Sequence, residues 1–128
     1  MQWKIIIAVF IGGAIGTYFR YLASFIIPEQ NVFSATLVVN ATGSLLLGFI
    51  TGWYLIRSNH QWLKLGLGTG LCGGYTTMST FAAESFRIAG ASPSGAILYV
   101  LMSVVGGMIA AGIGLVLGRG WAEKRMAT

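Results

Sequence analysis

Four long apolar blocks, separated by short polar segments, run along the chain. The polar segments are a turn at Pro28–Asn31, a loop at Arg57–Gln61, a stretch at Gly90–Gly95 and a charged C-terminal tail. Each block is about 20 to 25 residues long, which suits a helix crossing a hydrocarbon core about 30 Å thick. Because lipid offers the backbone no hydrogen-bond partners, each block must satisfy its own as a helix. The pattern predicts an all-α membrane protein with four transmembrane helices.

The blocks form one domain that covers residues 1–128, with predicted helices at about 4–27, 33–56, 62–88 and 95–118. Tryptophans stand at block ends, where interfacial anchors are expected; they are Trp3, Trp62 and Trp121. The first block is too long for a signal peptide, and no small-residue cleavage site follows it. We therefore expect a multi-pass protein of the inner (plasma) membrane, in contact with the lipid bilayer.

Composition excludes several classes of function. Of the 128 residues, 55% are hydrophobic and 9% are charged, whereas soluble domains carry about 25% charged residues. There is no Asp, and there are three Glu, one His and one Cys. The chain therefore lacks the residues for paired-carboxylate catalysis, for a Ser-His-Asp triad or for a cysteine zinc site, and an enzyme is not expected. The net charge is +5, but the basic residues form no stripe with aromatics, so no nucleic acid partner is expected.

The basic residues are distributed unevenly between the two predicted membrane faces. Six belong to the N-terminus, the second loop and the C-terminus, against Arg20 and Arg87 on the other side. Cytoplasmic loops carry the excess of Lys and Arg, so both termini are predicted to be cytoplasmic.

Glycines occur throughout the apolar blocks and predict close helix packing. Small residues let helix backbones approach each other in lipid, where burial of apolar surface contributes little to the free energy of helix association. Four helices of this size leave no room for an internal pathway, so association with a second copy is expected. The glycines assigned to packing are Gly12, Gly13, Gly16, Gly43, Gly48, Gly52, Gly106, Gly107, Gly112 and Gly114.

The third block holds a sequence that disfavours a continuous helix. Adjacent glycines and two threonines occur at its middle, so we predict a break near Gly73 to Thr77. A glycine-softened but continuous helix is the alternative. Breaks at mid-membrane occur where the freed carbonyls find a partner or line a cavity, and such carbonyls suit a small hard cation such as sodium.

Polar side chains inside the blocks are candidate functional groups, because burying them in a bilayer is costly. Thr36, Asn40 and Ser44 repeat at i, i+4 and i+8 on one helix face, as do Tyr99, Ser103 and Gly107. The third block adds hydroxyls and one carboxylate, from Thr76, Thr77, Ser79, Thr80 and Glu84.

Each candidate also has a plain structural alternative. Asn40 could make an ordinary helix–helix hydrogen bond, Glu84 could mark the membrane interface, and Arg20 could snorkel from its helix end. Taken together, the polar groups are rich in donors and poor in acids, which favours a small anion. A cation channel would be expected to have carboxylate rings or a regular carbonyl filter, and neither occurs.

Three segments resemble the fluoride channel family called Fluc or CrcB, and the resemblance covers nearly the whole chain. Gly12-Gly13-Ala14-Ile15-Gly16 with Arg20-Tyr21 is similar to its first-helix signature. Thr36-Leu37-Val38-Val39-Asn40-Ala41-Thr42-Gly43 is similar to its second-helix segment, with Ala35 where glycine is usual. The stretch from Gly73 to Phe81 resembles its G-G-x-T-T-F-S-T-F break, which is the most specific of the three.

The resemblance implies an antiparallel, dual-topology homodimer with two fluoride pores along the subunit interface. It implies a structural Na⁺ held by the backbone carbonyls of Gly73 and Thr76 from both copies. Asn40, Ser103 and Tyr99 are then expected to line the pore beside Phe81, with Arg20 favouring anions near a vestibule. A neighbouring polar track is implied for Thr36, Ser79, Thr80 and Glu84.

Two residues depart from the family pattern. Met78 stands where the first of two pore phenylalanines is usual; its thioether is adaptable but lacks the ring quadrupole. Gly107 stands where a serine can occur. The uneven basic charge also fits poorly with insertion in both directions, so a heterodimer with an oppositely biased paralogue is an alternative to the homodimer.

The expected function is passive efflux of fluoride across the cell membrane, which protects against fluoride toxicity. A small multidrug-type transporter is one alternative, but it needs a carboxylate in the first helix, where this chain has only Arg20 as a charged residue after Lys4. A non-transporting membrane assembly subunit is the other, and it predicts no ion flux from the purified protein.

Overall fold

The structure is a computed structural model that describes residues 2–26, 32–57 and 60–127, and all its regular elements are helices. Three of them are long and apolar enough to cross a membrane. These are α1 (Gln2–Ile26), α2 (Val32–Ile56) and α6 (Pro93–Lys124). The predicted turn at Pro28–Asn31 lies outside the described residues.

Helix α6 is longer than the sequence pattern predicted, since it ends at Lys124 rather than near residue 118. It begins where Pro93 occupies the first turn and the Ser92 hydroxyl accepts a hydrogen bond of 3.1 Å from the Gly95 N–H. A proline at the first helical position and a serine before it are a favoured helix start. The basic tail thus extends the last span instead of leaving the helix.

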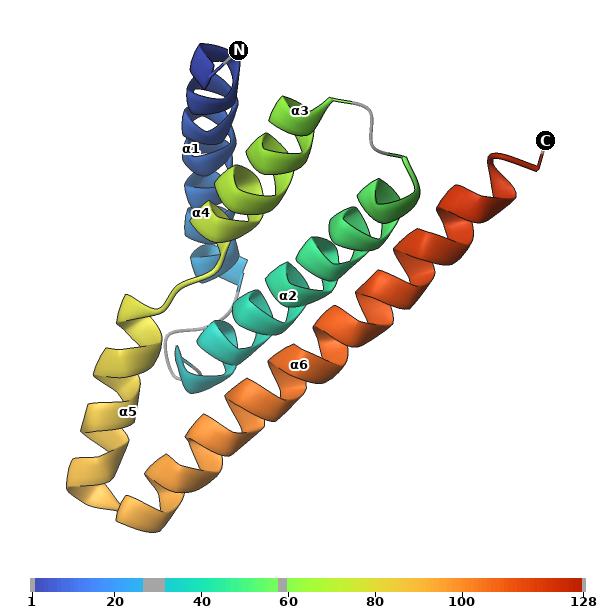
Figure 1. Cartoon of the computed structure of the whole chain (residues 1–128). Coiled ribbons are helices and arrows are strands. Elements are labelled where there is room, and N and C mark those ends of the chain that lie inside the picture. The colour runs from blue at the N-terminus through green and yellow to red at the C-terminus, as the bar shows by residue number, and fades with distance from the viewer. Residues whose placement is uncertain (1, 27–31, 58–59, 128) are drawn as a thin grey trace.

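The third apolar block forms four consecutive elements. They are α3 (Gln61–Leu65), the π-helical stretch η2 (Gly66–Cys72), α4 (Gly73–Tyr75) and α5 (Ser79–Ala91). Between α4 and α5 the backbone is extended at Thr76, with φ −75° and ψ 162°. Figure 1 shows the consequence: α3 and α4 lie beside α1, whereas α5 turns away toward the start of α6.

Glycines set the contact between α2 and α6, which run side by side in Figure 1. A side chain at Gly48 would overlap the Ala111 carbonyl oxygen, and one at Gly114 would overlap the Leu45 carbonyl oxygen. The next turn repeats this reciprocal pattern with Gly52 on α2 and Gly118 on α6. The backbones therefore touch directly, as expected for small-xxx-small pairs in membranes.

Two other glycines of α6 have no packing partner among the described residues of this chain. A side chain at Gly106 or Gly112 would meet no described atom within 4 Å. Sequence spacing alone could not separate these glycines from Gly114, because which face of α6 meets α2 is set by the tertiary contact.

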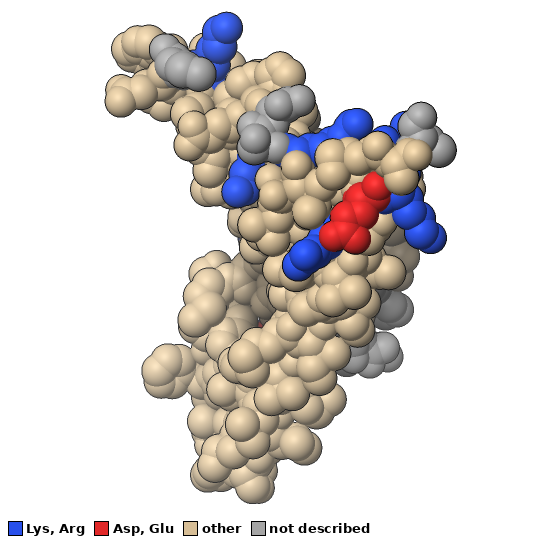
Figure 2. Space-filling model, turned by 45° about the vertical axis from the view of Figure 1, so that its right-hand side comes forward, with Lys and Arg blue, Asp and Glu red and all other residues tan. Residues whose placement is uncertain are grey.

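Both termini lie at the same end of the molecule (Figure 1). In the space-filling view of Figure 2, Lys and Arg gather at this end, and the remainder of that face carries almost no charged side chain. Trp53 and Trp121 contact each other there with ring centroids 5.2 Å apart and planes tilted by 56°, and Arg57 and Arg125 lie over their faces. Elsewhere large apolar side chains are exposed, among them Phe10 at 77% and Phe86 at 82%. Such a surface suits lipid or another protein copy.

Candidate functional site

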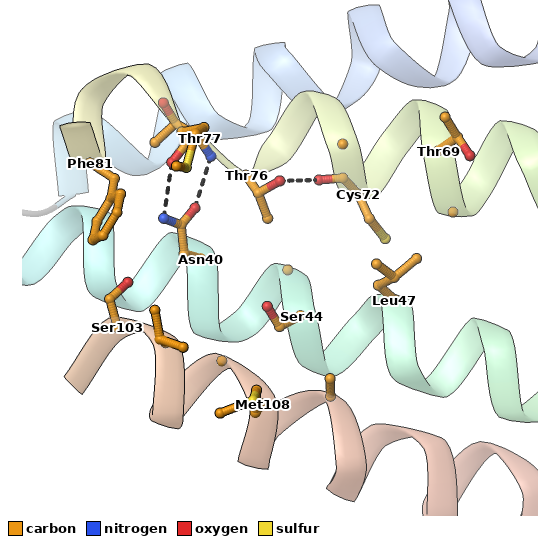
Figure 3. A pocket seen from close by; sticks show the side chains of 17 residues that line it. Asn40, Ser44, Leu47, Thr69, Cys72, Thr76, Thr77, Phe81, Ser103 and Met108 are labelled. Atoms are coloured by element: carbon orange, nitrogen blue, oxygen red, sulfur yellow. Dashed lines mark hydrogen bonds between the residues drawn. The ribbon is translucent and has the colours of Figure 1, made fainter. Parts of the chain in front are cut away.

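The extended segment between α4 and α5 is held against α2 by one side chain. Asn40 accepts a 2.8 Å hydrogen bond from the Thr77 N–H on its Oδ1, and its Nδ2 donates a 3.0 Å bond to the Thr77 carbonyl oxygen (Figure 3). Since a backbone N–H can only donate and a carbonyl only accept, the two bonds fix the orientation of the amide. One N–H of Asn40 remains for another partner.

A groove of about 710 Å³ opens along this segment. Asn40, Phe81 and Ser103 come together in it from three different elements, α2, α5 and α6 (Figure 3). Its remaining lining is mostly apolar and small. The full lining is Asn40, Gly43, Ser44, Leu47, Gly68, Thr69, Cys72, Gly73, Thr76, Thr77, Met78, Phe81, Ser103, Val104, Gly107, Met108 and Ala111.

Several predicted pathway residues therefore share one surface. Asn40, Met78, Phe81 and Ser103 all line the groove, as do both predicted sodium ligands. The Ser103 hydroxyl makes no hydrogen bond to another described residue. Met78 is 74% exposed, so this part of the groove wall faces outward from the chain. The groove is thus a lateral surface with donors at its floor, open on one side.

Glu84 is buried at the junction of α2, α5 and α6. Its side chain is 3% exposed. Thr36 donates a 2.9 Å bond to one carboxylate oxygen and Tyr99 donates a 2.5 Å bond to the other. The Tyr99 ring also packs on Phe81, with centroids 5.4 Å apart, so this buried cluster supports the groove floor.

The remaining predicted hydroxyls gather around Thr77. The Thr77 hydroxyl donates to the Thr80 hydroxyl at 3.0 Å and accepts from the Thr80 N–H at 3.3 Å. Ser79 lies 3.4 Å from the same Thr77 oxygen. The side chain of Thr77 thus caps the first turn of α5, in the way that threonine satisfies free N–H groups at helix starts. Ser79 and Thr80 are exposed.

Arg20 lies on the α1 side of the extended segment and outside the groove lining. Its Nη1 donates a 2.8 Å hydrogen bond to the Thr76 carbonyl oxygen. The guanidinium therefore has a hydrogen-bond partner within the protein.

Comparison with known proteins identifies the family. The family described as CrcB-like protein, Camphor Resistance (CrcB), matches residues 7–115. A protein of Halalkalibacterium halodurans named fluoride-specific ion channel FluC 2 is 45% identical over 95% of this chain and 91% of its own length. The chain belongs to the CrcB-like family. It is a multi-pass membrane protein.

Other CrcB-like relatives carry the same kind of name. A Bacillus subtilis protein named fluoride-specific ion channel FluC 2 is 47% identical over 91% of this chain and 88% of its own length. One from Azotobacter vinelandii, named fluoride-specific ion channel FluC, is 38% identical over 87% of this chain and 94% of its own. These relatives are named as ion channels and not as enzymes.

Both predicted sodium ligands, Gly73 and Thr76, lie in the groove lining of this CrcB-like chain. Among the described residues, no three His, Cys, Asp or Glu side chains lie close enough to hold a metal. Thr77 gives its N–H to Asn40 and not to Gly73, and the space beside Gly73 is open. The Thr76 carbonyl retains one lone pair beside the Arg20 bond. Carbonyl oxygens are hard ligands of the kind that a sodium ion prefers.

Thr77 was among the polar candidates of the third block, but no role was predicted for it. Its peptide receives both Asn40 bonds and its hydroxyl caps α5. Two adjacent threonines at the predicted break were the available signal, but the chain alone gave no reason to choose Thr77 over Thr76. Ser44 also lines the groove, and its i+4 spacing from Asn40 was visible in the sequence.

Proposed function

We propose that this chain forms a fluoride-selective channel that lets fluoride leave the cell passively. The observation that carries the proposal is the second N–H of Asn40, which lies in a groove where Ser103 and the Phe81 ring converge. Fluoride is small and tightly hydrated, so its water must be replaced by donors at close range. The relatives' names agree with this anion.

Some groove residues donate hydrogen bonds to the anion, and the others exclude water. Asn40 and Ser103 donate N–H and O–H groups, and Phe81 presents a ring edge that is electropositive. The apolar remainder, including Met78 in place of a ring, keeps the passage narrow and poor in water. With a groove free of carboxylate side chains, an anion meets no like charge along this surface.

The open side of the groove is closed by a second copy. Met78 is 74% exposed at this surface, and a lateral groove becomes a pore only when another wall covers it. We place the two copies antiparallel in the inner (plasma) membrane, with the broken third span of each at the centre. The one-sided basic charge keeps a heterodimer with a paralogue as the second arrangement.

The same second copy would complete a sodium site. Gly73 and Thr76 of each copy would supply the carbonyl oxygens, and a bound Na⁺ would add positive charge near the path of the anion. The chain's own contribution is to hold these oxygens in place through Asn40 and Arg20.

Two other functions are weighed against these residues. A proton-coupled multidrug transporter needs a carboxylate on the first span, and α1 (Gln2–Ile26) contains none. An assembly subunit without transport needs no donor-lined groove. Neither of these two functions therefore explains why Asn40, Phe81 and Ser103 lie together in the groove.

The experiment that tests the proposal is fluoride efflux from liposomes that contain only the purified chain, followed with a fluoride electrode. We expect efflux that is fast with wild type and lost with Asn40→Asp, which places a negative charge in the groove. Thr51→Ala is the matched control, since Thr51 lies on α2 and bonds only within its own helix. No efflux from folded wild-type dimer would refute the proposal.

A test of the arrangement uses a cysteine introduced at Ala127, with native Cys72 buried. An antiparallel homodimer predicts that half of the introduced thiols react from each side of sealed vesicles. Labelling from one side only would exclude it and favour the heterodimer.

A further inference from the structure

We infer that Arg20 is a positioning residue: its guanidinium fixes the extended segment through the Thr76 carbonyl, so that Asn40 can hold the neighbouring Thr77 peptide. The functional importance of this contact rests on the proposed function, because the extended segment forms one wall of the groove. Its physical basis is independent of which ion passes, because it concerns contacts within one chain.

The spacing along α1 places Arg20 where it can act. Gly12, Gly16 and Arg20 follow one another at four-residue intervals and so lie on one helix face. A side chain at Gly12 would overlap the Gly66 carbonyl, and one at Gly16 would overlap the Leu71 carbonyl. The glycines therefore bring the α1 backbone into contact with η2, and Arg20 reaches the end of α4 one turn farther on.

The contact that Arg20 makes occurs where helical bonding stops. The Thr76 N–H still bonds the Cys72 carbonyl at 2.9 Å, but Thr77 turns its N–H to Asn40. Carbonyls at such an end have no partner from the next helical turn and need one from elsewhere. Arg20 supplies it for Thr76 at 2.8 Å, and Thr17 reaches the Gly74 carbonyl at 3.4 Å.

The peptide between Thr76 and Thr77 is therefore held from opposite sides. Arg20 on α1 bonds the Thr76 carbonyl, and Asn40 on α2 bonds both polar groups of Thr77. The Thr76 carbonyl and the Thr77 N–H belong to the same planar peptide unit. Fixing the carbonyl toward α1 thus points the N–H toward Asn40, and the two side chains orient one peptide plane between them.

The charge of Arg20 has no carboxylate to satisfy it among the described residues. Their one ion pair joins Arg119 and Glu123, and Glu84 is bonded by two hydroxyls. A guanidinium bonded to a neutral carbonyl keeps its full positive charge. A role for charge alone, as an anion attractor, is therefore the competing explanation that the experiment must separate.

The test is amide hydrogen exchange of Thr77, measured by mass spectrometry with fragmentation on the dimer in lipid nanodiscs. Arg20→Met removes the bond and the charge, Arg20→Lys keeps the charge on a shorter side chain, and Arg87→Met removes an equivalent charge from α5. A positioning role predicts exchange about tenfold faster in Arg20→Met, corresponding to one lost hydrogen bond. It predicts an intermediate rate in Arg20→Lys and the wild-type rate in Arg87→Met.

Two results would overturn the inference. One is Thr77 exchange in Arg20→Met within twofold of wild type. The other is Arg20→Lys exchange equal to wild type, which is the decisive comparison if Arg20→Met does not fold as judged by size exclusion. Exchange is read whether or not the channel conducts, so failure of this inference is distinguishable from absent fluoride efflux in the wild type.

Discussion

Replacing Asn40 with alanine removes both hydrogen bonds that hold the Thr77 peptide against α2. The bonds measure 2.8 and 3.0 Å, and Thr77 is 9% exposed, so its N–H and carbonyl are left with little access to water. An unsatisfied buried polar group costs about 1–3 kcal/mol, whereas interhelical bonds in membrane proteins average about 0.6 kcal/mol each. Between these two limits, we expect a loss of about 2–4 kcal/mol in unfolding free energy for the two groups together.

The same replacement removes a donor from the proposed path of the anion. A hydrogen bond to a charged group is worth about 1.5–3 kcal/mol, and about 1.4 kcal/mol corresponds to a tenfold change. Fluoride efflux from Asn40→Ala liposomes should therefore fall about 10- to 100-fold. Asn40→Asp keeps an acceptor for the Thr77 N–H but opposes its carbonyl and the anion, so it should lose efflux while keeping more stability than Asn40→Ala.

Stability is followed by unfolding in mixed detergent, and efflux with a fluoride electrode. Thr51→Ala, on the same helix, should leave both unchanged, because its hydroxyl bonds only the Leu47 carbonyl at 2.8 Å. The reasoning is refuted if Asn40→Ala stays within twofold of wild-type efflux and within about 0.5 kcal/mol in stability, which is the size of ordinary surface substitutions.

Three further predictions follow from contacts described above. Tyr99→Phe should cost about 1.5–3 kcal/mol in unfolding free energy, since it removes one of two donors to a buried carboxylate; Tyr54→Phe is the control, and equal stability of the two variants would contradict this. Gly114→Ala should lower the thermal midpoint by forcing α2 and α6 apart, whereas Gly120→Ala, with open space beside it, should not; equal midpoints would contradict backbone contact. Ser103→Ala should reduce fluoride efflux about tenfold with unchanged stability, because its hydroxyl bonds no other described residue; wild-type efflux would remove it from the path.

Much of the architecture follows from the length of the apolar blocks. A span of 20 or more apolar residues is a strong signal, and α1, α2 and α6 correspond to three of the predicted blocks. Helix ends were less predictable: α6 continues to Lys124 because long basic side chains remain compatible with a helix at the interface. The π-helical η2 (Gly66–Cys72) had no sequence signal, since glycine permits many backbone conformations without selecting one.

The site was predictable as a set of residue types but not as a set of partners. Asn40 and Ser103 were candidates because polar groups in apolar spans are costly, whereas Phe81 was implied by the family resemblance; all three line one groove. That Asn40 holds Thr77, and that Glu84 is shared by Thr36 and Tyr99, depends on contacts between helices far apart in sequence. Helical periodicity predicts on which face of its helix a residue lies. It does not predict which residue of another helix that residue will contact.

The central claim is that a donor-lined, acid-free groove conducts fluoride in preference to larger halides. It is tested most directly by recording reversal potentials of the purified channel in a planar bilayer, with a fluoride gradient and an opposite chloride gradient across it. The account predicts a reversal potential close to the fluoride equilibrium potential. A reversal potential midway between those of fluoride and chloride would contradict it, because the narrow passage past Asn40 would then not distinguish the two ions.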